Sequence, residues 1–205
     1  IPLTLLNARP SKSRERMPKT NLALLACFAA ITCKSQQVAD SLARLGIPQE
    51  RVHNFGDLRA SAPALSVDTP ALGELNKAIS GRPIWAAASS HAEDEAAIID
   101  ACRLVLKQQP NTLLIWAPRH PQRATAIIAA ANGLSIQQRS LNAQITKDTQ
   151  IYLADTLGEL GTLFSSSDIV FLGGSFGDEG GHNPYEPACF GCVVVSGENF
   201  RNHKD

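Results

Sequence analysis

The sequence predicts an α/β fold, in which a doubly wound parallel sheet carries helices on both faces. From Gly81 onward, short apolar runs alternate with longer amphipathic runs, the order expected of β-strands connected by helices. Connections long enough to hold a helix join parallel strands, whereas antiparallel strands need only short turns. The predicted strands cover residues 82–88, 112–117, 135–140, 150–155, 168–174 and 192–196, and the predicted helices cover residues 90–109, 121–132, 157–166 and 184–191.

The helix over residues 90–109 has the clearest pattern, because its apolar side chains recur at the spacing of one helix face. These side chains are Ala97, Ile98, Ala101, Leu104 and Val105. The helix over residues 121–132 is closed by Gly133, a residue type that is common where helices end. The strands between the helices are short apolar runs, as expected of strands that are buried on both faces.

A similar but shorter α/β pattern precedes Gly81. It consists of strands over residues 1–8, 30–35 and 51–55, a helix within residues 14–29 and a helix over residues 36–46. Residues 58–80 are rich in Ala, Pro and Ser and poor in bulky apolar residues, which is typical of an interdomain linker. We therefore predict the end of one domain over residues 1–57, a linker over 58–80, and most of a second domain over 81–205.

The composition excludes several function classes. The chain has 205 residues with 19 basic and 19 acidic side chains, and this neutral balance gives no reason to expect a nucleic-acid partner. No apolar run reaches the roughly 18 residues of a membrane span. The chain starts inside a predicted strand and without Met, so we expect a fragment of a longer protein.

The five cysteines show neither the density nor the spacing of a disulfide framework, which indicates reduced thiols. Cys189 and Cys192 form a C-x-x-C pair, which occurs in redox and zinc sites. There is no second cysteine pair, and Cys192 opens a predicted strand, so this spacing favours ordinary packing. The acidic residues Asp178, Glu179 and Glu186 also lack a partner motif with ligand spacing, and we expect neither a metal nor another cofactor.

The glycine-rich segment over residues 173–191 follows a predicted strand and leads into a predicted helix. Asn183 suits the N-cap of that helix, Pro184 its first position and Glu186 its third. A capping box would explain Asn183 and Glu186. The glycines at 173, 174, 177, 180 and 181 favour a second interpretation, in which a ligand approaches the backbone because no Cβ obstructs it.

Three other predicted strands end in polar residues at the same edge of the sheet. Arg119 and His120 follow one strand, and the fork of Arg119 suits a phosphate or a base edge, although an exposed basic turn is an equal alternative. Ser90 and Glu93 after another strand are predicted to form a capping box beside His91. Ligands of doubly wound sheets bind at the carboxyl ends of strands, so four polar strand ends indicate a ligand site. The fourth strand is followed by Asp155, Thr156, Gly158 and Glu159.

Five segments together resemble the bacterial 3-deoxy-D-manno-octulosonic acid (Kdo) transferases, which are glycosyltransferases of the GT-B type with Rossmann-like domains. The resemblance runs over essentially the whole chain, and the combination of "PRHP", "DT-x-GEL" and "GGHNP-x-E" is specific. The resemblance implies that the chain is mostly the C-terminal, donor-binding domain of a two-domain enzyme. The matching segments are residues 5–9, 87–95, 117–123, 155–160 and 171–191.

Carried over by residue, the resemblance implies a set of contacts to CMP and one catalytic residue. Arg59, in "GDLR", stands where the family has a Lys that stabilises charge in the transition state. Leu157 and Tyr185 replace the Met and Leu that the family usually has, at positions that can make contacts through the backbone. The implied CMP contacts are Pro118, Arg119, Leu157, Gly158, Glu159, Asn183, Pro184, Tyr185 and Glu186.

The implied reaction is transfer of Kdo from CMP-Kdo to a lipid A precursor in lipopolysaccharide biosynthesis. In the family, the glutamate base and the acceptor- and membrane-binding surface lie upstream of the part matched here, and the implied location is the cytoplasmic face of the bacterial inner membrane. Two alternatives remain. One is another GT-B glycosyltransferase or a sugar-nucleotide epimerase that uses a UDP-sugar. The other is a non-catalytic nucleotide-binding module.

Overall fold

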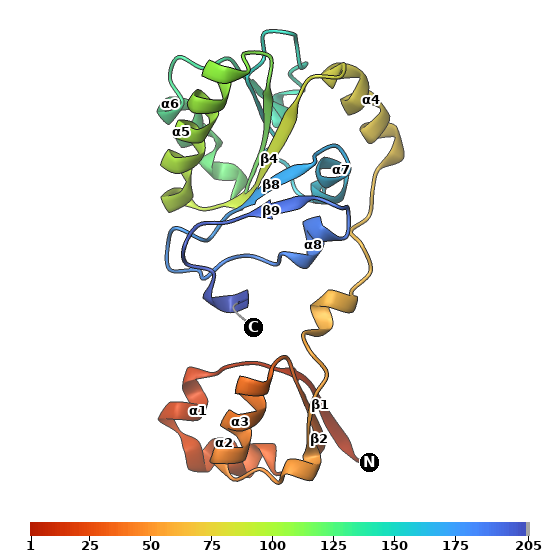
Figure 1. Ribbon diagram of the computed structural model, residues 1–205, viewed down its shortest axis with the longest axis vertical. Coiled ribbons are helices and arrows are strands. Elements are labelled where there is room, and N and C mark those ends of the chain that lie inside the picture. The colour runs from red at the N-terminus through yellow and green to blue at the C-terminus, as the bar shows by residue number, and fades with distance from the viewer. Residues whose placement is uncertain (204–205) are drawn as a thin grey trace. The chain divides into compact units, whose positions relative to one another are not determined.

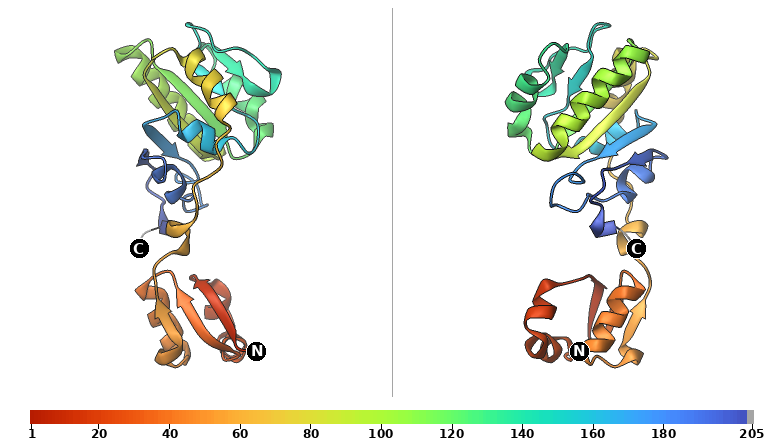
Figure 2. Two further views of the ribbon diagram at one scale, coloured as in Figure 1. Left: turned by 90° about the vertical axis from the view of Figure 1, so that its right-hand side faces the viewer. Right: turned by 60° about the vertical axis from the view of Figure 1, so that its left-hand side comes forward.

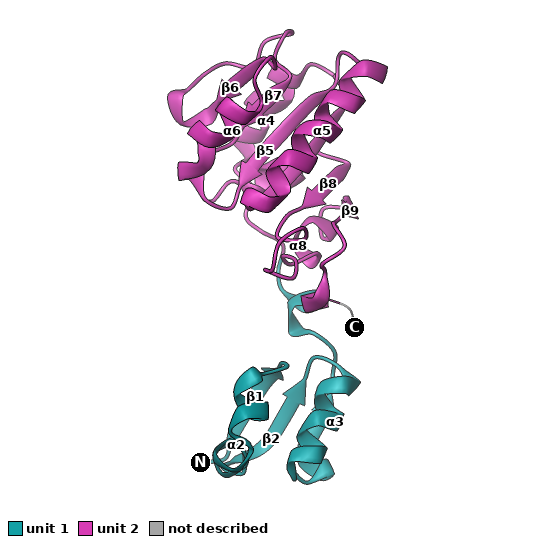
Figure 3. Cartoon of the chain, turned by 90° about the vertical axis from the view of Figure 1, so that its left-hand side faces the viewer, with its two compact units in different colours: residues 1–63, 205 teal, residues 64–204 magenta. Residues whose placement is uncertain are grey.

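The computed structural model describes residues 1–203 and divides them into two compact units, residues 1–63 and residues 64–203 (Figure 3). The division falls inside the segment 58–80 that the sequence predicts to be a linker. Residues 204 and 205, the last two of the predicted second domain, lie outside the described residues. Each unit has a sheet and an apolar core of its own.

Unit 1 contains a three-stranded parallel sheet with the strand order β1-β2-β3. Its core consists of apolar side chains from the sheet and from α2 and α3, including Ile31 and Leu42, which are fully buried. The predicted strands and the helix over 36–46 are confirmed. The elements are β1 (Leu3–Ala8), α1 (Lys12–Arg16), α2 (Pro18–Leu25), β2 (Phe28–Cys33), α3 (Gln36–Leu45), β3 (Val52–Asn54) and two 3-10 turns, η1 (Gln49–Arg51) and η2 (Leu58–Ser61).

Unit 2 contains a six-stranded sheet with the order β6-β7-β5-β4-β8-β9, and all five strand pairs are parallel. Figure 1 labels β4, β8 and β9 of this sheet, and Figure 3 labels β5, β6 and β7. The strands that follow β4 in the chain, β5 to β7, lie on one side of it, and the last two strands, β8 and β9, lie on its other side. The winding direction therefore reverses between β4 and β8. All six strands predicted after Gly81 are present. They are β4 (Ile84–Ser90), β5 (Leu113–Pro118), β6 (Ile136–Gln138), β7 (Ile151–Leu153), β8 (Ile169–Leu172) and β9 (Val193–Val195).

Two apolar clusters cover the two faces of this sheet and confirm the doubly wound prediction. One cluster joins α5 (Ala92–Gln108) and α6 (Ala124–Ala130) to the strands and contains the fully buried Trp116. The other cluster packs α4 (Thr69–Ile79) and α7 (Leu160–Phe164) against the opposite face around Phe164. In both views of Figure 2, α4 and α5 lie on opposite sides of the strands. A short helix, α8 (Tyr185–Ala188), precedes β9.

The helix α4 lies in the segment predicted to be a linker. Asp68 caps its first turn by accepting a hydrogen bond from the backbone N–H of Ala71 at 2.9 Å, and a proline stands in the first turn, where its missing N–H costs nothing. The helix carries few bulky side chains, yet Leu75 and Ile79 pack into the cluster around Phe164. Low hydrophobicity therefore concealed a helix that belongs to unit 2.

Arg82 closes the amino-terminal edge of the sheet. Its side chain is buried and donates four hydrogen bonds to backbone carbonyl oxygens, and burial lowers the pKa of its guanidinium. The acceptors belong to the turn before β5 and to the segment before β7, so a single cation ties both segments to the start of β4. They are Asn111 (2.9 Å), Thr112 (3.3 Å), Thr146 (3.0 Å) and Thr149 (2.6 Å).

At the opposite edge, Gly173 allows the end of β8 to approach the end of β4 closely. A Cβ at this position would lie 2.5 Å from the Cα of Ser90 and 2.6 Å from the carbonyl oxygen of Ser89, and both of these are backbone atoms. A side chain here would have to push the two chain segments apart. Glycine at 173 is therefore required by the packing of unit 2 itself.

Replacing Gly173 with Ala should lower the free energy of unfolding of unit 2 by about 1–3 kcal/mol, because backbone atoms cannot move aside cheaply. Gly73→Ala is the matched control, since Gly73 lies inside α4 and a Cβ added there would have no neighbour within 4 Å, and it should raise stability by about 0.4–1 kcal/mol. Urea unfolding followed by circular dichroism measures both variants. Equal stability of Gly173→Ala and the wild type would contradict the close approach.

Candidate functional site

The carboxyl ends of four neighbouring strands, β7, β5, β4 and β8, form one edge of the sheet in unit 2. Asp155 lies just beyond β7, Arg119 follows β5, His91 follows β4 and Gly173 follows β8. The reversal of winding direction between β4 and β8 is the place where doubly wound sheets bind ligands. The sequence prediction that these strand ends share one edge is confirmed.

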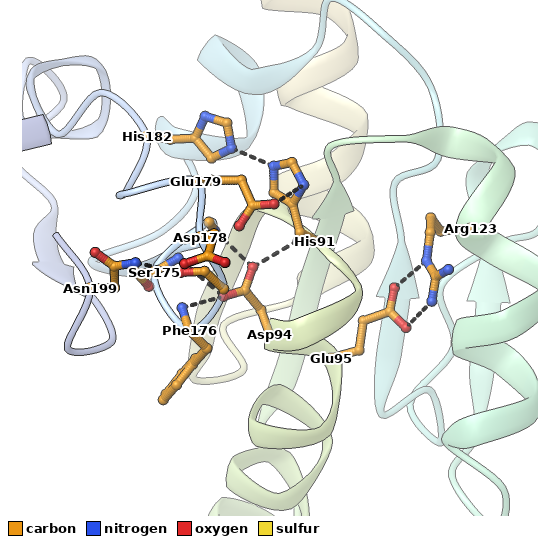
Figure 4. Close-up of polar contacts among 12 residues, drawn as sticks. His91, Asp94, Glu95, Arg123, Ser175, Phe176, Asp178, Glu179, His182 and Asn199 are labelled. Atoms are coloured by element: carbon orange, nitrogen blue, oxygen red, sulfur yellow. Dashed lines mark hydrogen bonds and ion pairs between the residues drawn. The ribbon is translucent and has the colours of Figure 1, made fainter. Parts of the chain in front are cut away.

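Asp94 fixes the glycine-rich loop to the start of α5 (Figure 4). Its carboxylate is fully buried and accepts four backbone N–H bonds, one from the residue that caps the helix and three from the loop after β8. A buried charge needs this many partners, because burial removes its hydration. The donors are His91 (2.7 Å), Gly174 (2.7 Å), Ser175 (3.3 Å) and Phe176 (3.1 Å).

The predicted capping box of Ser90 and Glu93 is wrong, because the observed capping residues lie one position later in the chain. His91 is the N-cap of α5, and the box pairs His91 with Asp94. Ser90 is the last residue of β4, is fully buried, and accepts a hydrogen bond from the indole N–H of Trp116 at 2.8 Å. The shift arises because β4 runs two residues further than the apolar run that predicted it.

The glycines of the loop are explained by close packing against other protein atoms, inside and outside the loop, so they do not by themselves indicate a ligand. Gly181 has a φ of +85°, and a Cβ there would collide with the ring of Phe200. A Cβ at Gly174 would lie 3.0 Å from the His182 ring. A ligand is therefore not needed to account for these glycines, contrary to the second interpretation of the sequence.

Asn183 and Glu186 contact each other through their side chains, but not as the capping box of the first interpretation, because Pro184 is the N-cap of α8. The Asn183 amide donates to the Glu186 carboxylate at 3.1 Å, and its oxygen accepts from the backbone N–H of Tyr185 at 3.3 Å. The helix α8 begins at Tyr185 with Pro184 as its N-cap, one position later than the sequence indicated. All four of these side chains are half-buried, so they remain accessible at the edge.

Pro118 and Arg119 stand at the end of β5. Pro118 is buried as the last residue of the strand, and the backbone N–H of Arg119 donates to the carbonyl of Ser90 at 3.0 Å. The Arg119 side chain is exposed. Its main chain is thus held against β4 while its guanidinium faces solvent at the edge.

The turn after β7 presents Leu157, Gly158 and Glu159. Leu157 is 75% exposed and Gly158 has a φ of +87°, a conformation that favours glycine. Glu159 forms an ion pair with Arg139 at 2.7 Å and also accepts a hydrogen bond from the Thr156 hydroxyl. Burial opposes the charge of Glu159, but these hydrogen bonds outweigh it and lower the pKa of the carboxyl.

Arg139 is a site residue that the sequence pattern does not single out, although it directly follows β6. Its hydrogen bonds to Glu159 raise the pKa of the guanidinium. The pair borders a cavity of about 370 Å³, which is also lined by side chains of α4 and α7. Asp155 accepts hydrogen bonds from the side chains of Gln138 and Ser140, each at 2.7 Å. Burial alone would raise the pKa of Asp155, but these hydrogen bonds outweigh burial and lower it.

Three histidines meet at this edge, and the sequence pattern assigns a function to none of them. The Nε2 atoms of His91 and His182 lie 2.9 Å apart, and their rings stack at a centroid distance of 5.1 Å. The ring of His120 meets His91 edge-on at 5.5 Å. The Glu179 carboxylate lies 3.7 Å from Nδ1 of His91 (Figure 4). The histidines are far apart along the chain, so no local signal reveals their contact.

Arg59 belongs to unit 1, whereas the strand ends that carry the other implied site residues belong to unit 2. Its guanidinium holds the Asp57 carboxylate through two nitrogens, with Nε at 3.0 Å from Oδ2. Asn7 donates to the same carboxylate at 3.1 Å and accepts from the backbone N–H of Leu58. Hydrogen bonding from Arg59 lowers the pKa of Asp57 well below its ordinary range.

Residues 1–203 contain no group of three or more His, Cys, Asp or Glu side chains that could hold a metal ion. No helix within that range is long and apolar enough to cross a bilayer. The C-x-x-C pair consists of free thiols in different surroundings. Cys192 is buried and donates to the carbonyl oxygens of Phe164 and Ser167, whereas Cys189 is exposed.

Comparisons with known proteins agree with this geometry. A Kdo transferase of Haemophilus influenzae is 33% identical over 212 residues, which cover 98% of this chain and 49% of the relative. The C-terminal CMP-Kdo binding domain of WaaA from Acinetobacter baumannii matches with a TM-score of 0.60 and 31% identity, over 65% of this chain and 72% of that domain. A putative UDP-N-acetylglucosamine 2-epimerase of Listeria monocytogenes shares the fold, with a TM-score of 0.59, 16% identity and coverage of 95% and 50%. No protein-family model matches the sequence.

The fold and the polar edge define an α/β protein of the GT-B class, which includes glycosyltransferases and sugar-nucleotide epimerases. Within this class the chain belongs to the family of 3-deoxy-D-manno-octulosonic acid transferases. The chain spans about half the length of the curated relatives it matches. The family resemblance found in the sequence is therefore confirmed.

Replacing Asp94 with Asn should lower the free energy of unfolding of unit 2 by about 2–4 kcal/mol, because the amide NH2 would face backbone N–H donors. Asp100→Asn on the same helix is the control. Asp100 is exposed and lies 3.8 Å from Arg103, so its loss should cost less than about 1 kcal/mol. Thermal unfolding of both variants measures the difference. Equal effects would show that the four bonds to Asp94 contribute little.

Replacing Asp57 with Asn should weaken unit 1 in a pH-dependent way. The folded-state pKa of Asp57 lies below its ordinary value of 3.8, so the carboxylate stabilises the fold above that pH and loses this effect as the pH falls. The wild type should therefore exceed Asp57→Asn by about 1–3 kcal/mol near pH 7, and the gap should close in acid. Hydrogen exchange at the β2 amides of both proteins measures it. A stability difference between the two proteins that stays constant down to strong acid would contradict the ion pair.

Proposed function

We propose that this chain is the donor-nucleotide-binding part of an enzyme that transfers Kdo from CMP-Kdo to a lipid A precursor in lipopolysaccharide biosynthesis. The observation that carries the proposal is the match to the CMP-Kdo binding domain of WaaA at 31% identity over 72% of that domain. The residues of unit 2 that are implied to contact CMP come from three strand ends at one edge of the sheet, as a shared ligand would require.

The edge suits a cytidine nucleotide for chemical reasons. Arg119 offers a permanent positive charge beside the β4–β8 reversal, and carboxylates such as Glu186 accept hydrogen bonds from ribose hydroxyls. Glu186 is half-buried and accepts from Asn183 through Oε1, so its second oxygen is available to a sugar hydroxyl. Glu159, in contrast, is already held by Arg139 and shapes the wall of the neighbouring cavity.

In the proposed reaction, a hydroxyl of the acceptor attacks the anomeric carbon of Kdo in a single displacement. A carboxylate base takes the hydroxyl proton, the new C–O bond forms, and the bond to the phosphate breaks with its electron pair leaving on CMP. The charge that develops on the leaving phosphate is stabilised by cations, and Arg119 is the arginine of unit 2 for which the family resemblance implies a contact to CMP. We place the enzyme at the cytoplasmic face of the bacterial inner membrane, because its acceptor is a lipid.

Nucleotide preference tests the proposal. The chain should bind CMP more tightly than UMP or UDP, since its sequence identity to the CMP-Kdo binding domain is 31%, against 16% to the epimerase. Isothermal titration calorimetry with the three nucleotides gives the affinities directly. Tighter binding of UDP than of CMP would favour a UDP-sugar enzyme, and binding of no nucleotide would contradict the proposal.

Glu186→Ala should weaken CMP binding roughly ten- to a hundredfold if the carboxylate holds the ribose, because a hydrogen bond to a charged group contributes about 1.5–3 kcal/mol. If Glu186 serves only the start of α8, the variant should instead lose about 1 kcal/mol of stability and keep its CMP affinity. Glu198→Ala, at an exposed position of unit 2, is the control and should change neither quantity. Calorimetry and thermal unfolding separate the two roles.

A further inference from the structure

The hydrogen-bonded pair of His91 and His182 lies where the winding direction of the sheet reverses. His91 follows β4 and caps α5, and His182 lies in the glycine-rich segment that follows β8 (Figure 4). Their Nε2 atoms are 2.9 Å apart, and the planes of the two rings differ by 11°. Neither residue belongs to the set of CMP contacts that the family resemblance implies.

The bond between the two rings fixes how many protons the pair can hold. One Nε2 must donate and the other must accept, so a neutral pair carries a single proton on each ring. The Glu179 carboxylate beside Nδ1 of His91 favours a proton on that nitrogen, which makes His91 Nε2 the acceptor and His182 the donor. The donor ring, His182, then has a bare Nδ1, which can take one more proton while its Nε2–H bond is kept. The hydrogen bond to the second, nearly parallel ring then stabilises the positive charge. A second added proton would break the bond, since both Nε2 atoms would then be donors.

The groups around the pair come from every neighbouring element of this edge. Burial, and after it the positive charges of His91 and Arg119, lower the pKa of His182, while Asp94 and Glu179 act in the opposite direction. Asp94 is already occupied by four backbone N–H groups, and His120 lies edge-on to His91. These surroundings favour neutral His182 near pH 7. An anionic ligand beside the pair would reverse that preference.

We propose that the His91–His182 pair binds the phosphate of the nucleotide and takes up a proton as it does so. The inference rests on the proposed function, because it takes the ligand at this edge to be a cytidine monophosphate group. Phosphates bind at the carboxyl ends of strands in doubly wound sheets, next to helix N-termini, and the pair sits at such a point on β4 and β8.

The proton gives the pair a role in the reaction as well as in binding. The phosphodiester of a CMP-sugar carries one negative charge, and the CMP that leaves carries two at neutral pH. Arg119 supplies a permanent positive charge, and the proton taken up by the pair offsets the second negative charge as the glycosidic C–O bond breaks. The pair therefore stabilises the leaving group more than the intact donor.

Proton-linked calorimetry on the whole chain tests the inference. CMP binding is measured at about pH 7.5 in buffers of different ionisation enthalpy, where a phosphate monoester with a second pKa of about 6 is largely a dianion. The wild type should take up a fraction of a proton with CMP, and cytidine should bind without uptake. His182→Gln keeps an amide that can bond to His91 but cannot titrate. It should bind CMP about ten- to a hundredfold more weakly, without uptake, and bind cytidine as the wild type does.

The control is His53→Gln, at an exposed position of β3 in unit 1, which should keep both the affinity and the proton uptake. CMP binding by the wild type without uptake, or uptake retained in His182→Gln, would overturn the inference and leave the proposed function standing. Absence of CMP binding in the wild type would overturn both. If His182→Gln unfolds, the wild-type uptake decides without any variant.

Discussion

The ligand edge of unit 2 depends on one buried carboxylate. Asp94 accepts backbone N–H bonds from the start of α5 and from the loop after β8, and it joins these two chain segments. The loop has little regular structure of its own, so its shape cannot come from a ladder of backbone hydrogen bonds. Its first residues, Gly174 to Phe176, are held from outside, by a charge that has no other way to be satisfied in a buried position.

The same carboxylate explains why the histidine pair exists in its observed form. The backbone N–H of His91 and that of Gly174 both donate to one oxygen of Asp94, so the ring of His91 and the loop that carries His182 are held at a fixed separation. Asn183 to Glu186 follow directly in the chain. An anchor at the beginning of the loop therefore determines where the residues at its end can reach.

The fold was predictable from the sequence because the apolar runs after Gly81 are short, regular and separated by amphipathic helices. The helix α4 was not, since its few apolar side chains, Leu75 and Ile79, are too sparse to give a strong period. The common edge of Arg119, Glu159 and Asn183 followed from the parallel topology. The partners Arg139 and His182 did not, because contacts between distant strand ends depend on strand order, and the sequence pattern does not specify that order.

The reason for the glycines of the loop also could not be predicted from the sequence. A glycine that leaves room for a ligand and a glycine that leaves room for Ser90 or Phe200 look alike in the chain, and only the neighbouring atoms distinguish them. The surroundings of Arg59 were also hidden in the sequence. Asp57 binds the Arg59 guanidinium and accepts a hydrogen bond from Asn7, and these contacts restrain the arginine side chain. The charge of Arg59 is evident from the chain, whereas the partner that restrains it depends on the fold.

The buried guanidinium of Arg82 at the other edge of the sheet fixes the start of β4, so this strand is held at both of its ends. Arg82 gathers four carbonyl oxygens just before the strand begins, and Asp94 gathers four N–H groups just after the strand ends. β4 is thus clamped at both ends and flanked by β5 and β8, so it cannot slide past its neighbours without breaking one of the two clusters. Exposed side chains such as Arg119 can change their conformation at this edge without breaking either cluster, whereas sliding of β4 against its neighbours cannot occur without that loss.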